Sequence, residues 1–284
     1  MESVICVGSI ACNVGLGLKE YKNYKISFID DEVQKTSRNS YCFKKYETPE
    51  KYEEQYDPGI DDFLKKRVTG DSTFIVSGAS LISGALLRMM QAVKKTNPTS
   101  NIQVLYVKPD TTLLSETKKL QERVVYNVLQ QYARSGVFTR LLLVCSESLS
   151  TLMTDTSIIE YYDKMNELIS STFHMINVLD NTKSVVDTFS PPRPTSRIAT
   201  MAVFVPGSQS EENLFFPLEN KAEARYYYGI PEAGLKEEKN LYREILAEMK
   251  KRVEKFSKVS YGIYETSYDT KIGYAILYSN QVQE

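Results

Sequence analysis

The sequence contains no tryptophan, one histidine (His174) and four cysteines that lie far apart. The cysteines form no CxxC pair, so neither a disulfide framework nor a cysteine-based zinc site is predicted. A single imidazole cannot build a histidine metal cluster, and its position inside an expected helix disfavours a Ser-His-Asp triad. No run of about 18 apolar residues is present, and no basic segment precedes an apolar one at the N-terminus. These absences predict a soluble, cytoplasmic protein with reduced thiols and no membrane partner.

The sequence also lacks an excess of charge of either sign. The 35 basic and 36 acidic residues leave a formal net charge of −1, which gives no electrostatic reason to expect direct binding of nucleic acid. Glycine is scarce as well, with 13 in 284 residues, whereas about 7% is typical. Proteins that wrap a nucleotide in glycine loops need that residue, so the shortage at first argues against such a function.

The N-terminal half alternates apolar runs with amphipathic segments, which is typical of an α/β fold with a parallel sheet covered by helices on both faces. The apolar runs predict strands at residues 4–8, 25–29, 73–76, 102–107 and 139–145. The amphipathic segments predict helices at residues 12–20, 61–68, 85–95 and 113–133. The polar, tyrosine-rich stretch 40–60 is expected to form a loop.

A long helix is predicted over residues 157–179, with Asp155 or Thr156 as its N-cap. Its apolar positions recur at steps of three and four, which keeps one face buried over roughly 35 Å. The apolar positions are Ile158, Tyr162, Met165, Ile169, Phe173, Ile176 and Leu179.

The pattern changes after Pro191. We expect a strand at 198–205, a tyrosine-rich stretch around 226–228, a charged helix at 238–256 and two last strands at 258–264 and 272–278. The tyrosines are expected to stand half-buried on sheet faces. The chain is therefore predicted to comprise a Rossmann-like nucleotide-binding-type domain (1–155), a central helix and following loop (156–190), and a smaller C-terminal α+β domain (191–284).

Ligands of parallel sheets bind at the carboxyl ends of the strands. Two turns there carry candidate residues, Gly8–Val14 and Ser77–Gly84, and each is followed by a helix whose N-terminal amides can hold phosphate. On the long helix, Tyr162 and Asn166 are one turn apart, so a ring and an amide share one face and can stack on and hydrogen-bond a purine. The alternative is an ordinary helix with a buried ring and a solvated amide.

Four stretches, in their order along the chain, resemble the tubulin/FtsZ superfamily, and its small phage or plasmid members most. The stretches are Ile26–Gln34, Val107–Pro109, Thr139–Leu149 and, most specifically, Ile158–Ile169. The resemblance covers about 280 residues and implies a Rossmann-like domain, one central helix and a smaller α+β domain. It also implies a cytoskeletal protein that forms head-to-tail homopolymers, with GTP or GDP and Mg²⁺ bound where subunits meet.

The resemblance implies roles for individual residues. Tyr162 and Asn166 would recognise guanine, Asn13 would lie near the nucleotide, and Glu116 would contact the ribose. Asn13 has a plainer interpretation, a helix N-cap or a polar residue in an early turn of the helix. The phosphate loops would use Gly8, Gly78, Ser83 and Gly84. Acidic residues after the central helix, Asp180 and Asp187, would act on the nucleotide of the next subunit.

The sequence departs from the superfamily where the chemistry is most demanding. The stretch Ala79–Ile82 replaces glycines of the phosphate loop, and bulky Leu81 and Ile82 are poorly suited to positive φ. The second acidic position falls on Lys183, which cannot polarise a water as a carboxylate can. GTPase activity therefore stays open, and two functions are compared. One is a filament-forming protein with GTP at the interface, and the other is a pseudo-GTPase whose Leu81 and Ile82 fill the phosphate space.

A third class, a Rossmann-like enzyme with a dinucleotide or a methyl donor, requires a GxGxxG motif after the first strand. Gly8 is followed by Ser-Ile-Ala-Cys instead, which disfavours this class.

Overall fold

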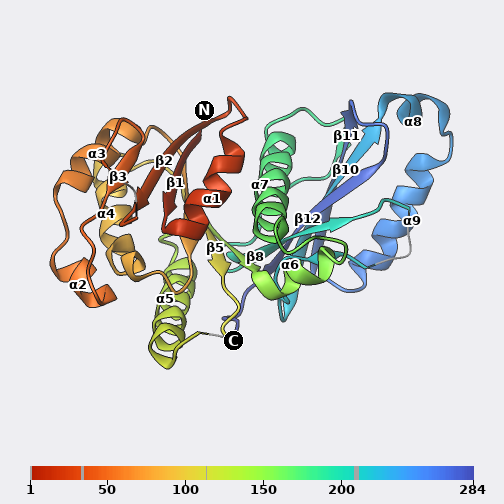
Figure 1. Ribbon diagram of the computed structural model, residues 1–284. Helices are drawn as coiled ribbons and strands as arrows, with labels where there is room; N and C mark the ends of the chain where they lie inside the picture. Colours follow the sequence, from red (N-terminus) through yellow and green to blue (C-terminus); the bar gives the residue numbers. More distant parts are fainter. Residues whose placement is uncertain (1, 33–34, 113, 208–210) are drawn as a thin grey trace. The chain divides into compact units, whose positions relative to one another are not determined.

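The computed structural model describes residues 2–32, 35–112, 114–207 and 211–284, and it divides into two compact units, Met1–Ser170 and Ser171–Glu284 (Figure 1). Within these ranges, no helix combines the length and the apolar character needed to cross a membrane. Each unit is described by itself below.

The first unit is built on a parallel sheet with the strand order β3-β2-β1-β4-β5-β6. The central strand β4 is buried along its whole length, as expected when helices cover both faces of a sheet. The five strands predicted for this part of the chain are confirmed, and a sixth strand, β3, was not predicted. The strands are β1 Glu2–Val7, β2 Tyr24–Asp30, β3 Ser40–Cys42, β4 Ser72–Ser77, β5 Ile102–Lys108 and β6 Arg140–Cys145.

Helices connect these strands, and their ends follow local capping chemistry. In α5 the hydroxyl of Ser115 accepts a hydrogen bond from the Lys118 amide at the N-terminus, and Gly136 closes the C-terminus with φ +86°. The first helix begins at Ser9, three residues before the predicted start. The helical segments are α1 Ser9–Leu18, α2 Pro49–Glu54, α3 Gly59–Arg67, the 3₁₀-helix η1 Leu81–Ala85, α4 Leu86–Thr96, α5 Glu116–Ser135 and α6 Ser146–Leu152.

The prediction of a loop over residues 40–60 is wrong. This segment contains β3, α2 and the start of α3. Its aromatic side chains supply the reason, since Phe43 and Tyr52 are buried with their ring centroids 5.3 Å apart. Thr48 accepts a hydrogen bond from the Lys51 amide, and Pro49 occupies the first turn, so α2 is also capped locally.

The long helix α7 spans Tyr161–Asp180 and belongs partly to each unit. It begins four residues later than predicted, so Asp155 and Thr156 do not cap it. The apolar stripe is buried from Met165 onward, whereas its first two members, Ile158 and Tyr162, are exposed. The residues just before this helix and its first turn therefore present apolar side chains to solvent.

The second unit has the strand order β8-β12-β10-β11-β7, with β9 paired to β8. The last two strands follow each other in the sequence, yet β10 lies between them, parallel to β11 and antiparallel to β12. The elements are β7 Val186–Asp187, β8 Ile198–Phe204, β9 Asn213–Leu214, β10 Lys221–Pro231, α8 Glu232–Glu237, α9 Leu241–Val253, β11 Lys258–Thr266 and β12 Ile272–Ser279.

The tyrosine-rich stretch forms β10, where Tyr226, Tyr227 and Tyr228 are completely buried. The expectation that they would be half-buried is wrong, because β10 is an interior strand and its neighbourhood contains further aromatic rings. Phe204, for example, meets Tyr226 and Tyr228 with centroids 5.6 and 5.2 Å away.

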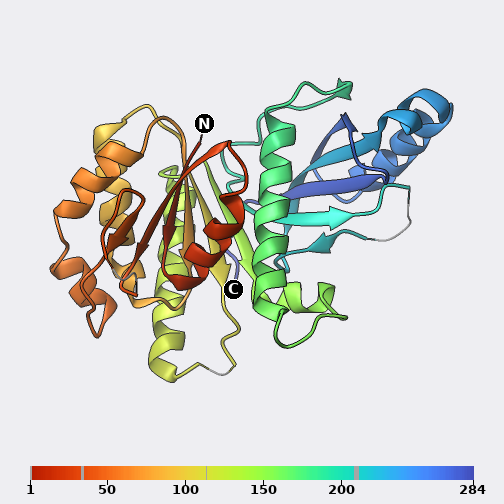
Figure 2. The same cartoon turned by 45° about the horizontal axis from the view of Figure 1, so that its top comes forward.

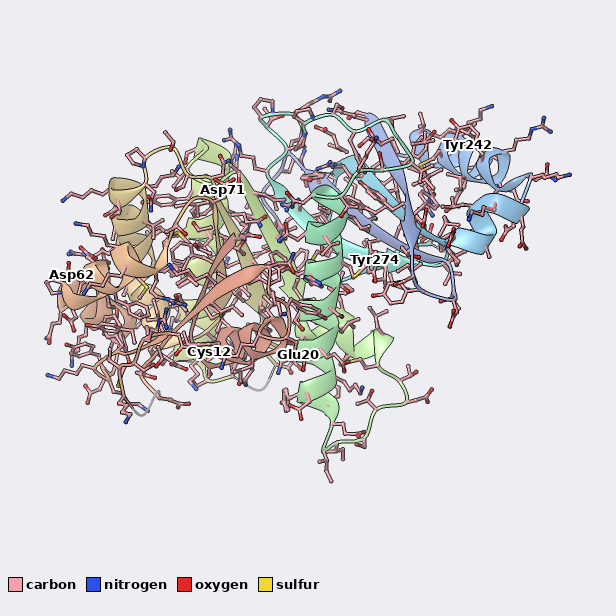
Figure 3. All side chains as sticks on the ribbon, turned by 90° about the horizontal axis from the view of Figure 1, so that it is seen from above. Cys12, Glu20, Asp62, Asp71, Tyr242 and Tyr274 are labelled. Atoms are coloured by element: carbon pink, nitrogen blue, oxygen red, sulfur yellow. The ribbon has the colours of Figure 1, made fainter. Side chains whose placement is uncertain are left out.

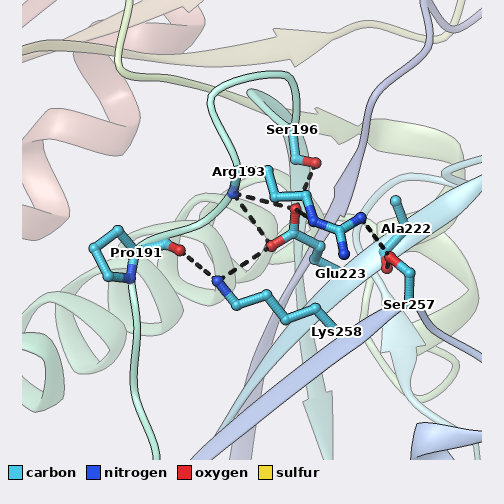
Figure 4. A network of polar contacts seen from close by, with 7 residues as sticks. All are labelled: Pro191, Arg193, Ser196, Ala222, Glu223, Ser257 and Lys258. Carbon is cyan, nitrogen blue, oxygen red and sulfur yellow. Dashed lines mark hydrogen bonds and ion pairs between the residues drawn. The ribbon is translucent and has the colours of Figure 1, made fainter.

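A buried carboxylate, Glu223, organises the proline-rich segment that leads into this sheet (Figure 4). It accepts hydrogen bonds from the Ser196 hydroxyl (2.7 Å) and the Arg193 amide (3.2 Å). Lys258 Nζ lies 3.8 Å away. Buried charges require such partners, so this network ties residues 191–196 to β10 and β11.

Candidate functional site

The two turns singled out in the sequence lie together at the carboxyl edge of the first unit's sheet. Gly8 follows β1 with φ +91°, a conformation that favours glycine. A Cβ atom at Gly8 would lie 2.9 Å from Ser80 Oγ and 3.0 Å from Ser77 Oγ. Gly8 is thus required both by its own backbone conformation and by the close approach of the second turn.

One backbone amide at this edge of the sheet already has a hydrogen-bond partner within the protein. The Ala11 amide, in the first turn of α1, donates to Ser77 Oγ at 2.8 Å in a buried hydrogen bond. An amide with a buried protein partner is not available to a phosphate oxygen without breaking that bond.

The second turn does not form an open loop. Residues 81–85 form η1, in which the Ser83 hydroxyl donates to the Ser80 carbonyl oxygen at 2.5 Å. Gln121 Nε2 donates to the same carbonyl oxygen at 2.6 Å. Ile82 is buried, whereas Leu81 is half-buried.

Gly84 packs on the backbone of α2, whereas the sequence suggested that a small residue here could start a helix and pack on the sheet. A Cβ atom there would lie 2.0 Å from the Pro49 carbonyl oxygen and 2.6 Å from its carbonyl carbon. Helix α2 therefore packs directly on the backbone of η1. Gly78 is similarly constrained, because a Cβ there would lie 2.6 Å from Pro109 Cδ.

Ala79 adopts φ +59° although it has a side chain. It stands in the stretch where the resemblance places glycines. A left-handed conformation costs a non-glycine residue roughly 1–2 kcal/mol, a cost that a glycine at this position would not have.

The purine-facing candidates lie on two helices that run side by side from the same edge of the sheet, α1 and the first half of α7 (Figures 1 and 2). Gly17 permits their close approach, since a Cβ there would lie 2.5 Å from Ser170 Oγ. Asn13 and Asn166 each precede this contact by four residues. Because helices rise about 1.5 Å per residue, the two amides lie at the same height along the pair.

Tyr162 is 73% exposed and Asn166 is half-buried. The alternative of a buried ring at position 162 is therefore wrong. Asn13 is exposed and is the fifth residue of α1, so it is not the N-cap of that helix. Glu116, the candidate ribose ligand, is exposed at the first position of α5 and forms an ion pair with Lys119 at 2.9 Å.

The candidate catalytic acids belong to the second unit and lie on different elements. Asp180 ends α7, and its Oδ1 accepts a hydrogen bond from the Tyr227 hydroxyl (2.7 Å) and lies 3.3 Å from Arg225 Nη2. Asp187 lies on the exposed strand β7, where it accepts hydrogen bonds from the Ser184 hydroxyl and, at 3.3 Å, the Phe189 amide. Both carboxylates thus have partners within the chain, and Asp180 has a cationic one.

Sequence reasoning missed one titratable group near the first turn. Asp30, at the end of β2, is only 6% exposed, and burial together with the charges of Asp31 and Glu32 raises its pKa to about 6. The half-buried thiol of Cys12 in α1 (Figure 3) has its pKa raised to about 12 by burial and by the charge of Asp30. The signal in the sequence was an Asp-Asp pair at the carboxyl end of a predicted strand.

The raised pKa of Asp30 predicts a pH-dependent contribution to stability. A carboxyl group with a higher pKa in the folded state favours folding at low pH, and this contribution is lost as the pH rises through about 6. At pH 7 we expect Asp30→Asn to increase the free energy of unfolding by about 1–2 kcal/mol. Between about pH 4 and pH 6 we also expect the free energy of unfolding of this variant to change less with pH than that of the wild type, as measured by urea unfolding.

The matched control is Asp155→Asn, which changes an exposed carboxylate in the connection between α6 and α7. Parallel pH profiles for the wild type and Asp30→Asn would contradict the assignment.

In the described part of the chain, no three His, Cys, Asp or Glu side chains come together in a way that could hold a metal ion.

The six-stranded parallel sheet, the long helix that follows it and the second unit with its own mixed sheet make up the tubulin/FtsZ fold. Three solved structures illustrate the similarity. The GTPγS-form protofilament of TubZ from Bacillus thuringiensis serovar israelensis matches with a TM-score of 0.74 at 12% identity, over 98% of this chain and 87% of that one. TubZ of Clostridium botulinum phage c-st matches with a TM-score of 0.66 at 10% identity, over 100% and 93%.

The GTPγS-bound protofilament of CetZ2 from Haloferax volcanii matches with a TM-score of 0.71 at 15% identity, over 98% and 92%. No protein-family model matches the sequence, and no curated protein is similar to it in sequence. At these identities the comparisons establish the fold, which confirms the fold class expected from the sequence.

Proposed function

We propose that this chain is a tubulin-like cytoskeletal protein that assembles head to tail into filaments. The observation that carries the proposal is the exposed apolar segment just before α7. Ile158 and Ile159 are 94% and 92% exposed and are followed closely by the exposed ring of Tyr162. Consecutive exposed isoleucines are costly in water and mark an association surface. This one borders the candidate nucleotide site, where the superfamily resemblance places the next subunit.

The fold supports the same proposal, because the similar structures of TubZ and CetZ2 were determined as protofilaments. Sedimentation of the purified protein over a concentration series, with electron microscopy of the pellets, tests it directly. We expect filaments above a critical concentration. A protein that stays monomeric at every concentration, with and without GTP, would contradict the proposal.

We further propose that GTP or GDP binds at the subunit interface, with its purine between α1 and the start of α7. Tyr162 would supply an accessible ring for stacking, and Asn166 and Asn13 would supply amides at one height. The groups assigned to phosphate fit less well, since the Ala11 amide and the Ser83 hydroxyl already have protein partners. Binding through the purine with weak phosphate contacts predicts a lower affinity than a glycine-rich loop would give.

Replacing Tyr162 or Asn166 by alanine should weaken GTP binding about tenfold or more in each case. Stacking of a base on an aromatic ring contributes about 1–3 kcal/mol, and an unpaired polar edge of the purine costs a similar amount. Isothermal titration with GTP measures the effect. Tyr242→Ala, an exposed tyrosine of α9 (Figure 3), is the matched control and should leave the affinity unchanged. Equal affinities in all three variants would place the purine elsewhere.

A second candidate function, a nucleotide-independent structural or assembly protein, is favoured by the packing of η1. Gly84 packs on the Pro49 backbone, and the Ser83 hydroxyl donates a hydrogen bond to the Ser80 carbonyl oxygen. Two residues of the candidate phosphate turn therefore stabilise the fold through contacts within the protein. This candidate predicts no GTP binding at several hundred micromolar and filaments that form equally without nucleotide. In either case we propose slow hydrolysis or none, because Asp180 lies beside Arg225 and the second acidic position is Lys183.

A further inference from the structure

A pocket of about 450 Å³ lies in the first unit beside strands β2 and β3 and helix α3, and its lining shares no residue with the two turns that follow β1 and β4. Four cationic side chains line it, from three separate segments of the chain. Lys25 comes from the start of β2, Arg38 from the connection between β2 and β3, and Lys66 and Arg67 from the end of α3. Asp62 is the one carboxylate among the described lining residues, and Figure 3 shows it at the left margin of the unit.

Among the described residues, no ion pair joins any of the four cations to a carboxylate, although other lysines and arginines of the chain form such pairs. Burial and the neighbouring charges of Arg67 and Arg38 lower the pKa of Lys25, and burial and Arg38 lower the pKa of Arg67. The pocket therefore holds like charges that repel one another.

Two of the cations are fixed in place by neutral acceptors. Arg67 Nη2 donates to the Ile26 carbonyl oxygen at 2.7 Å, and its Nε donates to Ser27 Oγ at 3.2 Å. Lys25 Nζ donates to the Lys66 carbonyl oxygen at 3.2 Å. These bonds orient the charges without cancelling them, which is the arrangement of a preorganised anion site.

The geometry distinguishes a small anion from a peptide strand. Strand β3 pairs with β2 only from Phe28 to Asp30, so the start of β2 forms a sheet edge that an added strand could pair with. Arg67 already occupies the Ile26 carbonyl on that strand. The lining also offers the hydroxyls of Thr36 and Ser37, which suit phosphate oxygens.

We propose that this pocket binds a small anion with two or more phosphate groups. Several cations around one concave site match a multiply charged ligand better than a single carboxylate, and guanidinium groups pair with phosphate through two parallel hydrogen bonds. The site is separate from the candidate nucleotide site, so it does not depend on GTP binding. The same chemistry is carried by soluble pyrophosphate compounds and by phosphorylated lipid headgroups.

Isothermal titration of the full chain with pyrophosphate at low ionic strength tests the proposal. Lys25→Gln/Lys66→Gln should weaken binding at least about tenfold, because two charge-assisted contacts are lost. Lys22→Gln/Lys65→Gln is the matched control, since it removes the same charge from exposed lysines next to these positions that do not line the pocket. Asp62→Asn should strengthen binding. Thermal melting of each variant establishes that it is folded.

Vesicles that contain a phosphorylated inositol lipid form the second arm. If the protein binds these vesicles, if pyrophosphate competes with that binding and if Lys25→Gln/Lys66→Gln abolishes it, the pocket is supported and its ligand is a lipid headgroup. Pyrophosphate binding without vesicle binding supports it and assigns a soluble ligand. The proposal is overturned if neither probe binds at millimolar concentration, or if both lysine pairs weaken binding equally.

Discussion

The double substitution Ile158→Ser/Ile159→Ser is expected to raise the critical concentration for polymerisation about a hundredfold. Burying an isoleucine side chain fully contributes about 1.5–3 kcal/mol, and each 1.4 kcal/mol is a factor of ten in an association constant. The expected hundredfold shift is at the lower end of what full burial of two isoleucines would give, because both side chains are expected to be only partly buried at a subunit interface. Sedimentation and light scattering over a concentration series measure the shift.

This experiment has a matched control on another helix of the same unit. Leu120 and Val124 are also exposed apolar residues, spaced by one turn of α5. Leu120→Ser/Val124→Ser should leave the critical concentration close to that of the wild type. If the two double variants shift it equally, the apolar segment before α7 is not the interface. Unchanged melting temperatures in both variants would show that the fold is intact.

Gly84→Ala is expected to lower the free energy of unfolding by about 3 kcal/mol. The added Cβ would lie 2.0 Å from the Pro49 carbonyl oxygen, which belongs to the backbone of α2 and cannot rotate away. Overpacking of this kind costs typically 1–3 kcal/mol, and contact with backbone places it at the upper end. Urea unfolding at neutral pH measures the change.

The control for this change is Gly234→Ala in α8. A Cβ there would meet Ile230 Cγ2 at 3.2 Å and the flexible end of Glu238 at 3.3 Å, so the expected change is below about 1 kcal/mol. The result also separates packing from ligand binding. If Gly84→Ala keeps its stability but loses GTP affinity, Gly84 serves the phosphate and not the contact with α2.

The residues that sequence reasoning placed well are those governed by local pattern. The apolar runs before Gly8 and Ser77 predicted β1 and β4, since strands buried on both faces have continuous apolar sequences. The periodic stripe of α7 was correct from Met165 onward. Tyr41 and Tyr52 lie in a segment without either pattern, and their burial against other parts of the unit stabilises β3 and adds to the local capping of α2.

By itself, the sequence determined the α/β class, most of the succession of strands and helices, and the positions of Gly8 and Gly78 after neighbouring strands at one edge of a sheet. These follow from periodicity and from parallel strand direction, which are properties of neighbouring residues. Only the tertiary structure decided which groups at that edge are already engaged. Gly84 meets Pro49, 35 positions earlier in the chain, and Ala11 donates to Ser77, 66 positions later. Contacts over such distances leave no periodic signal, because they depend on how whole elements pack. Where the resemblance places glycines of the phosphate loop, the structure has the 3₁₀-helix η1 with the buried side chain of Ile82.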